Sequence, residues 1–356
     1  MNNLLFAPFT LGSLSLNNRV VMAPLTRSRC VGNVPNEIVA TYYSQRCEAG
    51  LIVTEATSPS PNGLGYPRIP ALYSDRHVRK WQAVTTAVHA GDSRIFVQLM
   101  HTGRVAHPLN LPGDGCPLAP SAIANPGTMF TDQAGEQPFP VPRSMSEGDI
   151  EDAIREFKRS AKLAMRAGFD GVELHGANGY LIDQFLNTAS NQRTDLWGGS
   201  IENRARFALA VARSVAGAIG ARRVGLRLSP FGAFNNMRDD PQMHDLFAYL
   251  ARELSAIGLL YLHIVDLSST GLPPVKPSTL AAMRQGFGNT IILSGGFTKQ
   301  RAAAALASGT GDLIAFGRPF ISNPKLVSKF LHDQPLTVPD ESTYYTPGPR
   351  GYIDYD

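Results

Sequence analysis

The sequence predicts an α/β protein that folds as a (β/α)8 TIM barrel, and three observations support this class. Eight short apolar runs rich in Val, Ile and Leu are spread along the 356 residues, which is typical of parallel strands buried on both faces. Amphipathic helical segments fill the intervals between these runs. The alternation continues without a break, and eight strand–helix units can close into a barrel. We therefore expect a single domain over residues 1–356.

The expected strands are short and are distributed over the whole chain. In order they are RVVMAP from Arg19, LIVTEA from Leu51, IFVQLM from Ile95, GVELHG from Gly171, VGLRLS from Val224, LLYLHIV from Leu259, TIILSGG from Thr290 and DLIAFG from Asp312. The alternative fold is an open, doubly wound sheet, which usually has a glycine-rich turn after its first strand. Here that turn is MAPLTRSR and contains no glycine, which favours the barrel.

Helical patterns separate the strands, and the clearest of them covers residues 147–168. Ser146 precedes this helix as an N-cap, and Gly168 is suited to be its C-cap. Its apolar face consists of Ile150, Ile154, Phe157, Ala161 and Ala164. Similar helices are expected at about 200–219 and 298–308.

Two segments depart from the strand–helix repeat. The first 18 residues precede the first strand, and we expect them to form an N-terminal β-hairpin over the bottom of the barrel. The long loop after the third strand, from about 101 to 146, is rich in Gly and Pro. Loops of this length in a compact domain are usually functional, so we expect it to act as a lid.

Composition excludes several classes of protein. The 33 basic and 29 acidic residues give a formal net charge of +4, which is too balanced for a nucleic-acid or anionic-membrane partner. No apolar run reaches the roughly 18 residues of a membrane span, and the N-terminus does not resemble a signal peptide. Cys30, Cys47 and Cys116 are scattered, which indicates a reducing compartment and disfavours a zinc or iron–sulfur site. We expect a cytoplasmic protein without a metal, as a monomer or weak dimer.

Candidate functional residues follow from the barrel, because barrels place their active sites where strands end and the following loops begin. Polar side chains and glycines mark these places in an otherwise apolar set of strands. The candidates are Pro24, Leu25, Thr26, Glu55, Ala56, Gln98, Met100, His101, His175, Asn178, Tyr180, Arg227, Gly295, Gly296, Gly317 and Arg318.

The last two strand ends indicate a phosphate site. LSGGFTKQRA and AFGRPF each end a strand with glycine and lead towards a helix. Barrels commonly bind phosphate after strands seven and eight, through backbone N–H groups and a helix N-terminus. Arg318 would add a charge-assisted contact. The alternative is that these glycines only make tight turns, but two such loops in the expected places favour phosphate.

Gln98 and Arg227 lie within otherwise apolar strands. A buried polar side chain without a partner costs about 2 kcal/mol or more, and a charge costs more still. Since arginine keeps its proton, something anionic or rich in carbonyl groups is expected to face Arg227. An internal ion pair with Glu55 or Glu173 is an equally good explanation, and the sequence leaves both open.

The segment HGANGYL places His175, Asn178 and Tyr180 together at one strand end. If the chain turns into a helix there, His175 and Asn178 can direct N–H groups at one point. Two such donors can polarise a carbonyl or nitro oxygen and stabilise an enolate-like charge, each by about 3 kcal/mol in a dry site. Tyr180 can offer a phenolic proton. A metal role for His175 is disfavoured, because no second His or Cys lies at ligand spacing.

At these residues the chain resembles the old yellow enzyme family of flavin-dependent ene-reductases. The resemblance runs from PFTLGSLSLNNRVVMAPLTR to the GYIDY tail, and its most specific block is HGANGYLIDQFLNTASNQRTDLWGGSIENRARF. VGLRLSPFG, GRPFISNP and the pair Tyr344–Tyr345 add independent support. Thr26 stands where another branch has Cys, which points to the branch that includes N-ethylmaleimide reductase and pentaerythritol tetranitrate reductase.

The resemblance implies noncovalent FMN at the top of the barrel. The residues that match positions around its ring are Pro24, Leu25, Thr26, Ala56 and Gln98. Thr26 would lie near the flavin C4=O, and Arg227 would lie against the N1/C2=O edge and favour the anionic reduced flavin. The residues that would hold the phosphate are Gly295, Gly296, Gly317 and Arg318.

The resemblance also implies a ping-pong reaction in which NADPH reduces FMN and leaves before an activated alkene binds. His175 and Asn178 would bind the electron-withdrawing group, Tyr180 would supply the α-proton, and flavin N5 would deliver hydride to the β-carbon. The positions that would shape the substrate pocket are Tyr66, Met100, Phe234 and Tyr345. Many relatives have Trp at the position of Met100, so a wider pocket is expected here.

Two rival functions differ in what they require. A phosphate-binding aldolase or isomerase would be colourless and would need a Lys or paired carboxylates at the strand ends, which the sequence lacks. A flavin-binding sensor would leave His175, Asn178 and Tyr180 without a task. The sequence does not identify the natural alkene, the stereochemical outcome or a strict preference for NADPH over NADH.

Overall fold

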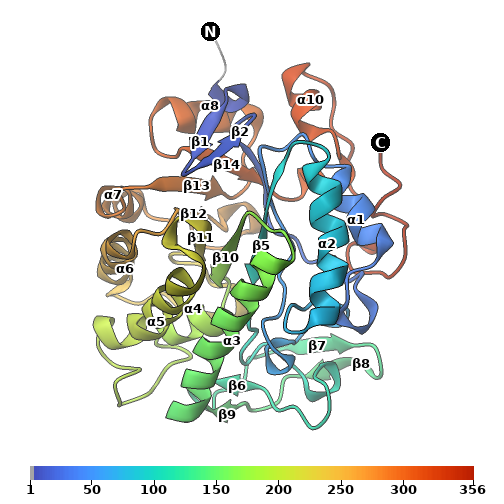
Figure 1. Ribbon diagram of the computed structural model, residues 1–356. Helices are drawn as coiled ribbons and strands as arrows, with labels where there is room; N and C mark the ends of the chain where they lie inside the picture. The colour runs from blue at the N-terminus through green and yellow to red at the C-terminus, as the bar shows by residue number, and fades with distance from the viewer. Residues whose placement is uncertain (1–3) are drawn as a thin grey trace.

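The computed structural model describes residues 4–356, and in this part of the chain eight parallel strands form a closed barrel (Figure 1). The strands are β3 (Val20–Met22), β4 (Leu51–Val53), β5 (Arg94–Leu99), β10 (Gly171–Gly176), β11 (Val224–Leu228), β12 (Tyr261–Val265), β13 (Thr290–Ser294) and β14 (Leu313–Phe316). Each pairs with the next in chain order, and β14 closes the ring on β3. The predicted barrel is confirmed, and every strand falls within an expected run except β5, which begins one residue earlier, at Arg94.

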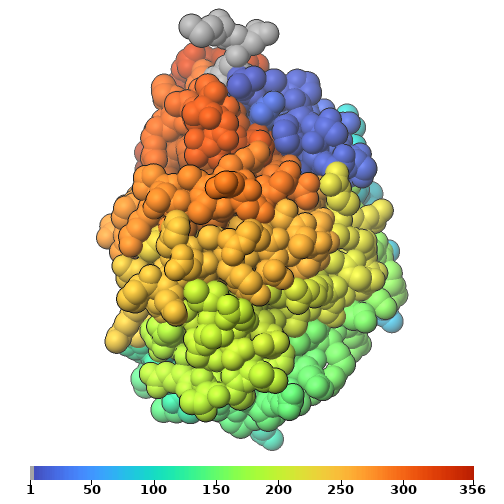
Figure 2. Space-filling model, turned by 90° about the vertical axis from the view of Figure 1, so that its left-hand side faces the viewer, coloured from blue at the N-terminus to red at the C-terminus, as the bar shows by residue number. Residues whose placement is uncertain are grey.

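Helices follow each strand and surround the barrel. They are α1 (Glu37–Ser44), α2 (Asp75–His89), α3 (Glu147–Arg166), α4 (Leu181–Leu186), α5 (Ile201–Ile219), α6 (Met243–Ile257), α7 (Pro277–Gly286), α8 (Lys299–Ala307), α9 (Pro319–Ser322) and α10 (Leu326–Leu331). Short 3-10 turns occur at Leu4–Phe6, Val31–Asn33, Pro61–Gly63, Pro108–Asn110, Ala221–Arg223, Phe234–Asn236, Ser268–Thr270 and Glu341–Thr343. Figure 2 views the side of α6 and α7, where the successive strand–helix units lie against one another in chain order.

The helix α3 illustrates why these segments are helical. The Ser146 hydroxyl accepts a hydrogen bond from the Asp149 backbone, and the Asp149 carboxylate accepts one from the Ser146 backbone, which makes a capping box. The predicted apolar face is buried, except that Ile154 is half-buried. The predicted C-cap was wrong by one residue: Ala167 is the cap, and Gly168 follows it in the left-handed conformation with φ 85°.

The bottom of the barrel is covered by the antiparallel hairpin of β1 (Phe9–Leu11) and β2 (Leu14–Leu16). Leu11 and Leu16 are buried and belong to one apolar cluster with residues from the lower ends of the barrel strands. The expected N-terminal hairpin is therefore confirmed, and residues 1–3 lie outside the described part.

The long loop after β5 carries four short strands, namely β6 (Leu118–Ala119), β7 (Thr128–Thr131), β8 (Gly135–Pro138) and β9 (Arg143–Ser144). β7 and β8 form an antiparallel hairpin, and β6 pairs with β9 in parallel. These strands lie at the end of the molecule opposite to β1 and β2 (Figure 1). None of the helices within residues 4–356 is long and apolar enough to span a bilayer.

Candidate functional site

A cavity of about 1060 Å³ opens at the carboxyl ends of the barrel strands. We call it the central cavity. Of the residues predicted for the site, those that line it are Pro24, Leu25, Thr26, Ala56, Tyr66, Gln98, Met100, His175, Asn178, Tyr180, Arg227, Phe234, Arg318 and Tyr345. The volume suits a cofactor together with a small substrate. The closed barrel therefore brings together, at the strand ends, residues that lie far apart in the sequence.

The three predicted phosphate glycines, Gly295, Gly296 and Gly317, are not part of the lining of the central cavity. A Cβ at Gly317 would lie 3.4 Å from Leu25 Cδ2, so this glycine is directly behind the wall. A Cβ at Gly295 would lie 2.1 Å from the Asp266 carbonyl oxygen, so the turn after β13 requires glycine there. Within the described chain, the backbone N–H groups of Gly296, Gly317 and Arg318 make no hydrogen bond. These free donors fit an anionic group.

Arg227 projects into the cavity wall from β11 and is only 8% exposed. It forms no ion pair within residues 4–356, and its Nε atom is buried without a hydrogen-bond partner. Burial lowers the pKa of Arg227, whereas the charge of Glu173 raises it. A guanidinium nevertheless keeps its charge, so this site favours an anionic or carbonyl-rich ligand.

The alternative of an internal ion pair for Arg227 is wrong for both candidate carboxylates. Glu55 accepts a hydrogen bond from the backbone of Arg27 at 3.2 Å, and burial raises its pKa to about 7. Glu173 is bound by three other side chains, among them Gln98, whose Nε2 donates to it at 2.8 Å. The partner that Arg227 requires must therefore come from the cavity.

His175 is set as a neutral hydrogen-bond donor at the end of β10. Burial, together with the nearby charge of Arg227, lowers its pKa well below the usual value. Its Nδ1 atom accepts a hydrogen bond from the Ala177 backbone at 3.3 Å, so the proton resides on Nε2. A neutral imidazole that lines the cavity can therefore donate from Nε2 to a ligand oxygen.

Asn178 adopts the left-handed conformation, with φ 60°, and its backbone is fixed on both sides. Its N–H donates to Ser229 Oγ at 2.9 Å, and its carbonyl accepts from Asn235 Nδ2 at 2.8 Å. Its side-chain Oδ1 is buried and has no partner in the described chain. The backbone is thus anchored while the amide remains available to the cavity that it lines.

Tyr180 is the N-cap residue of α4, and its ring lies edge-on to His175 with the ring centres 4.9 Å apart. Its hydroxyl is 3.1 Å from that of Tyr66. Burial raises the pKa of Tyr180 well above the usual value, so the phenol stays protonated. This arrangement suits a proton donor that a second hydroxyl orients.

The predicted substrate-pocket residues occupy two levels of the cavity. Met100 is 1% exposed and belongs to an apolar cluster with Ala56 and Tyr180. Phe234 and Tyr345 are 46% and 61% exposed and lie at the mouth. Met100 therefore lies at the inner level of the cavity, and the two exposed rings bound its entrance.

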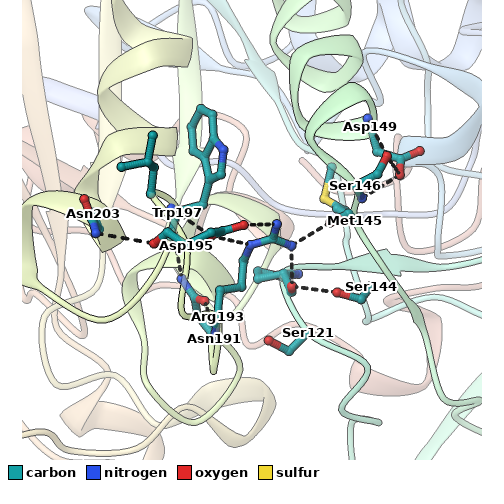
Figure 3. A network of polar contacts seen from close by, with 12 residues as sticks. Ser121, Ser144, Met145, Ser146, Asp149, Asn191, Arg193, Asp195, Trp197 and Asn203 are labelled. Atoms are coloured by element: carbon teal, nitrogen blue, oxygen red, sulfur yellow. Dashed lines mark hydrogen bonds and ion pairs between the residues drawn. The ribbon is translucent and has the colours of Figure 1, made fainter.

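The long loop contributes directly to the cavity, as expected of a lid, because Met129, Phe130 and Glu136 of the β7–β8 hairpin line it. The base of this loop is anchored by Arg193, whose Nη1 donates to the carbonyls of Pro120 and Met145 at 3.0 and 2.6 Å (Figure 3).

Arg193 is held in turn by Asp195, which accepts hydrogen bonds from both Nε and Nη2. The NQRTDLWGG segment thus positions the long loop.

Sequence reasoning missed two features of the site. Asn235 contacts the backbone of Asn178 and also lines the cavity. Its position in FGAFNN, just after a strand end, was a usable signal. Arg68 forms an ion pair with Asp132 at the tip of the β7–β8 hairpin and donates to the Tyr345 carbonyl at 2.9 Å. No spacing in the sequence predicts this junction of three segments.

The barrel and its cavity, with a buried cation, a neutral donor pair and a protonated tyrosine, agree with the flavin-dependent oxidoreductase that the sequence predicts, and the comparisons with known proteins show this class. The family model described as NADH:flavin oxidoreductase / NADH oxidase matches residues 4–337. The chain is 40% identical to 12-oxophytodienoate reductase 2 of Arabidopsis thaliana, over 99% of this chain and 95% of that protein. It therefore belongs to this FMN-dependent family, the old yellow enzymes.

Solved structures agree with the assignment. Morphinone reductase superposes with a TM-score of 0.96 at 43% identity, over 100% of this chain and 96% of the other. An old yellow enzyme homologue from Zymomonas mobilis superposes with a TM-score of 0.95 at 39% identity, over 99% of both chains. In sequence, the chain is also 40% identical to chanoclavine-I aldehyde reductase of Penicillium roqueforti, over 99% of this chain and 95% of that protein.

Proposed function

We propose that this protein is an FMN-dependent ene-reductase that reduces the C=C bond of small activated alkenes with NADPH. The observation that carries the proposal is the meeting of Arg227, His175, Asn178 and Tyr180 in the central cavity. The charged group suits an electron-rich cofactor edge, and the other three suit a substrate whose oxygen gains negative charge. Relatives named as reductases of 12-oxophytodienoate and morphinone support reduction chemistry.

The cofactor contacts follow from what each wall of the cavity offers. Pro24, Leu25, Thr26, Ala56 and Gln98 would surround the flavin ring, and Arg227 would face its carbonyl-rich edge. The free N–H groups of Gly296, Gly317 and Arg318, together with the turn at Gly295, would hold the phosphate. Bound FMN would supply the two-electron redox chemistry between the nicotinamide and the alkene.

The protein's own residues would activate and protonate the alkene. The Nε2–H of His175 and the amide of Asn178 would bind the oxygen of the electron-withdrawing group and stabilise the negative charge that develops there. Tyr180 would then donate its proton to the α-carbon, with the Tyr66 hydroxyl orienting it at 3.1 Å. Enones, maleimides, nitroalkenes, nitrate esters and nitroaromatics all present such an oxygen.

The reductant and the alkene would use the same cavity in turn, which gives ping-pong kinetics. A structure of morphinone reductase in complex with tetrahydroNAD, 44% identical to this chain, supports a nicotinamide dinucleotide as reductant. The preference for NADPH over NADH is our proposal.

The free cysteines Cys30, Cys47 and Cys116 support a reducing compartment, and we propose a cytoplasmic monomer or weak dimer.

The test uses the colour of the purified protein under anaerobic conditions. We expect a yellow protein that releases FMN on denaturation, is bleached by NADPH and regains its colour when 2-cyclohexenone is added. Parallel reactions with NADH measure the reductant preference. A colourless protein that takes up no FMN would exclude the proposal, and a yellow protein that NADPH bleaches but no alkene recolours would support the sensor function instead.

A further inference from the structure

A fully buried carboxylate lies inside the barrel next to the proposed flavin contacts. Glu173 is two residues before His175 on β10, so both side chains point to the same face of the strand. Its Oε1 accepts from Gln98 Nε2 at 2.8 Å, and its Oε2 accepts from the Tyr261 hydroxyl at 3.0 Å and from His263 Nδ1 at 2.9 Å. Four side chains from β5, β10 and β12 thus form one network.

Glu173 is ionised in this network. Burial opposes ionisation, but His263, through its charge and its hydrogen bond, outweighs it together with the positive charge of Arg227 and the hydrogen bond from Gln98, and the pKa of Glu173 is lowered. Burial lowers the pKa of His263, and this ring contacts the Glu173 carboxylate through Nδ1 at 2.9 Å while its Nε2 lies 3.1 Å from Ser294 Oγ. The acidic charge of the network is that of Glu173, and three side chains contact it.

The negative charge of Glu173 offsets the positive charge of Arg227 without a direct contact between the two side chains. Glu173 is the carboxylate that acts on Arg227, yet the two side chains form no direct ion pair in the described chain. Three donors hold the carboxylate in place, so it cannot turn to pair with the guanidinium. Arg227 is thereby stabilised as a cation but left free to contact a ligand.

The same network orients Gln98. Because its Nε2 donates to Glu173, its Oε1 is the amide atom left for the cavity that Gln98 lines. Gln98 therefore presents a hydrogen-bond acceptor, which suits an N–H group such as the one in the flavin ring.

We propose that Glu173 is a positioning residue that sets the reduction potential of the bound flavin. It partly offsets the charge that Arg227 presents, and it directs the oxygen of Gln98 towards the cofactor. A fixed negative charge close to the ring opposes the addition of electrons, so its removal makes the flavin easier to reduce. The inference rests on the proposed function, because it requires FMN in the central cavity.

The test measures the two-electron potential of bound FMN in Glu173→Gln by equilibration with a reference dye. Glutamine has nearly the same shape and lacks the charge. We expect the equilibrium to shift at least tenfold towards reduced flavin, which equals about 30 mV. Glu156→Gln is the matched control, because Glu156 lies on α3 and outside the central cavity, and its potential should equal that of the wild type.

The possible results separate this inference from the proposed function. A wild-type protein that binds no FMN contradicts both. A Glu173→Gln protein that binds FMN at the wild-type potential contradicts the role of Glu173 alone. If Glu173→Gln does not fold, His263→Leu tests the same charge, because the carboxylate that loses this donor is expected to take up a proton. The potential should then rise as well, and an unchanged potential would again overturn the proposal.

Discussion

The donor pair at the end of β10 leads to the most direct prediction, which concerns the double variant His175→Ala with Asn178→Ala. Both side chains line the central cavity; His175 is buried and Asn178 is half-buried. We expect a para-substituted phenol to bind as an anion and to need the same two donors as the oxygen of a substrate. It also stacks on the oxidised flavin, so its binding should be visible as a long-wavelength charge-transfer band.

The magnitude follows from the two hydrogen bonds that the variant loses. A hydrogen bond to a charged oxygen contributes about 1.5–3 kcal/mol, so two together contribute about 3–6 kcal/mol. At about 1.4 kcal/mol per tenfold, the phenol affinity should fall by roughly 10²- to 10⁴-fold. FMN should remain bound, because Arg227 and the free N–H groups near Gly296 and Gly317 are unchanged.

The assay is a spectrophotometric titration with the phenol, with FMN content measured on the same samples. His89→Ala with Asn203→Ala is the matched control, since these residues lie on α2 and α5, away from the cavity. An unchanged phenol affinity in the His175–Asn178 variant would refute the assignment of the substrate donors. Loss of FMN together with phenol would indicate that these residues hold the cofactor instead.

Three further predictions follow from other parts of the site. Tyr180→Phe should slow alkene reduction by about 10²-fold and leave flavin reduction by NADPH nearly unchanged, as stopped-flow absorbance of each half-reaction would reveal; equal rates would remove Tyr180 as the proton donor. The pKa of Glu55 is raised from 4.5 to about 7 in the folded protein, so the free energy of unfolding should fall as pH rises between these values. In Glu55→Gln this fall, measured by urea unfolding between pH 5 and 8, should be smaller by about 3 kcal/mol. If the wild type and the variant lose the same free energy of unfolding over this range, the prediction is wrong. Met100→Trp should narrow the inner cavity and change the product enantiomer ratio for a 2-substituted enone, measured by chiral chromatography, and an unchanged ratio would show that Met100 does not orient the substrate.

Much of the fold could be predicted because its signals are local. Each barrel strand coincides with an expected, mostly apolar run to within one residue, and α3 begins at the expected Ser146 cap. Because barrels place their active sites at the carboxyl ends of the strands, most of the residues predicted there line the central cavity. The C-cap was missed by one residue because Ala167 still has helical geometry and Gly168 alone takes the left-handed conformation.

The electrostatics of the site could not be predicted in the same way. The sequence allowed an ion pair for Arg227 with Glu55 or Glu173, and the structure excludes a direct pair with either within the described residues. Which of two carboxylates meets a cation depends on the inward side of each strand and on competing donors. Neither the inward side of a strand nor the competing donors can be determined before the strands are placed in the closed barrel.

The sequence by itself determined the barrel, its catalytic face and the segment HGANGYL, because apolar periodicity and turn residues act over a few neighbouring positions. The tertiary structure alone decided how charges and protons are distributed there. The contacts that place Glu173 join residues 75 to 90 positions apart, and burial in the closed barrel shifts the pKa values of His175 and Tyr180. Such contacts and desolvation depend on strand register and packing, which no local pattern encodes.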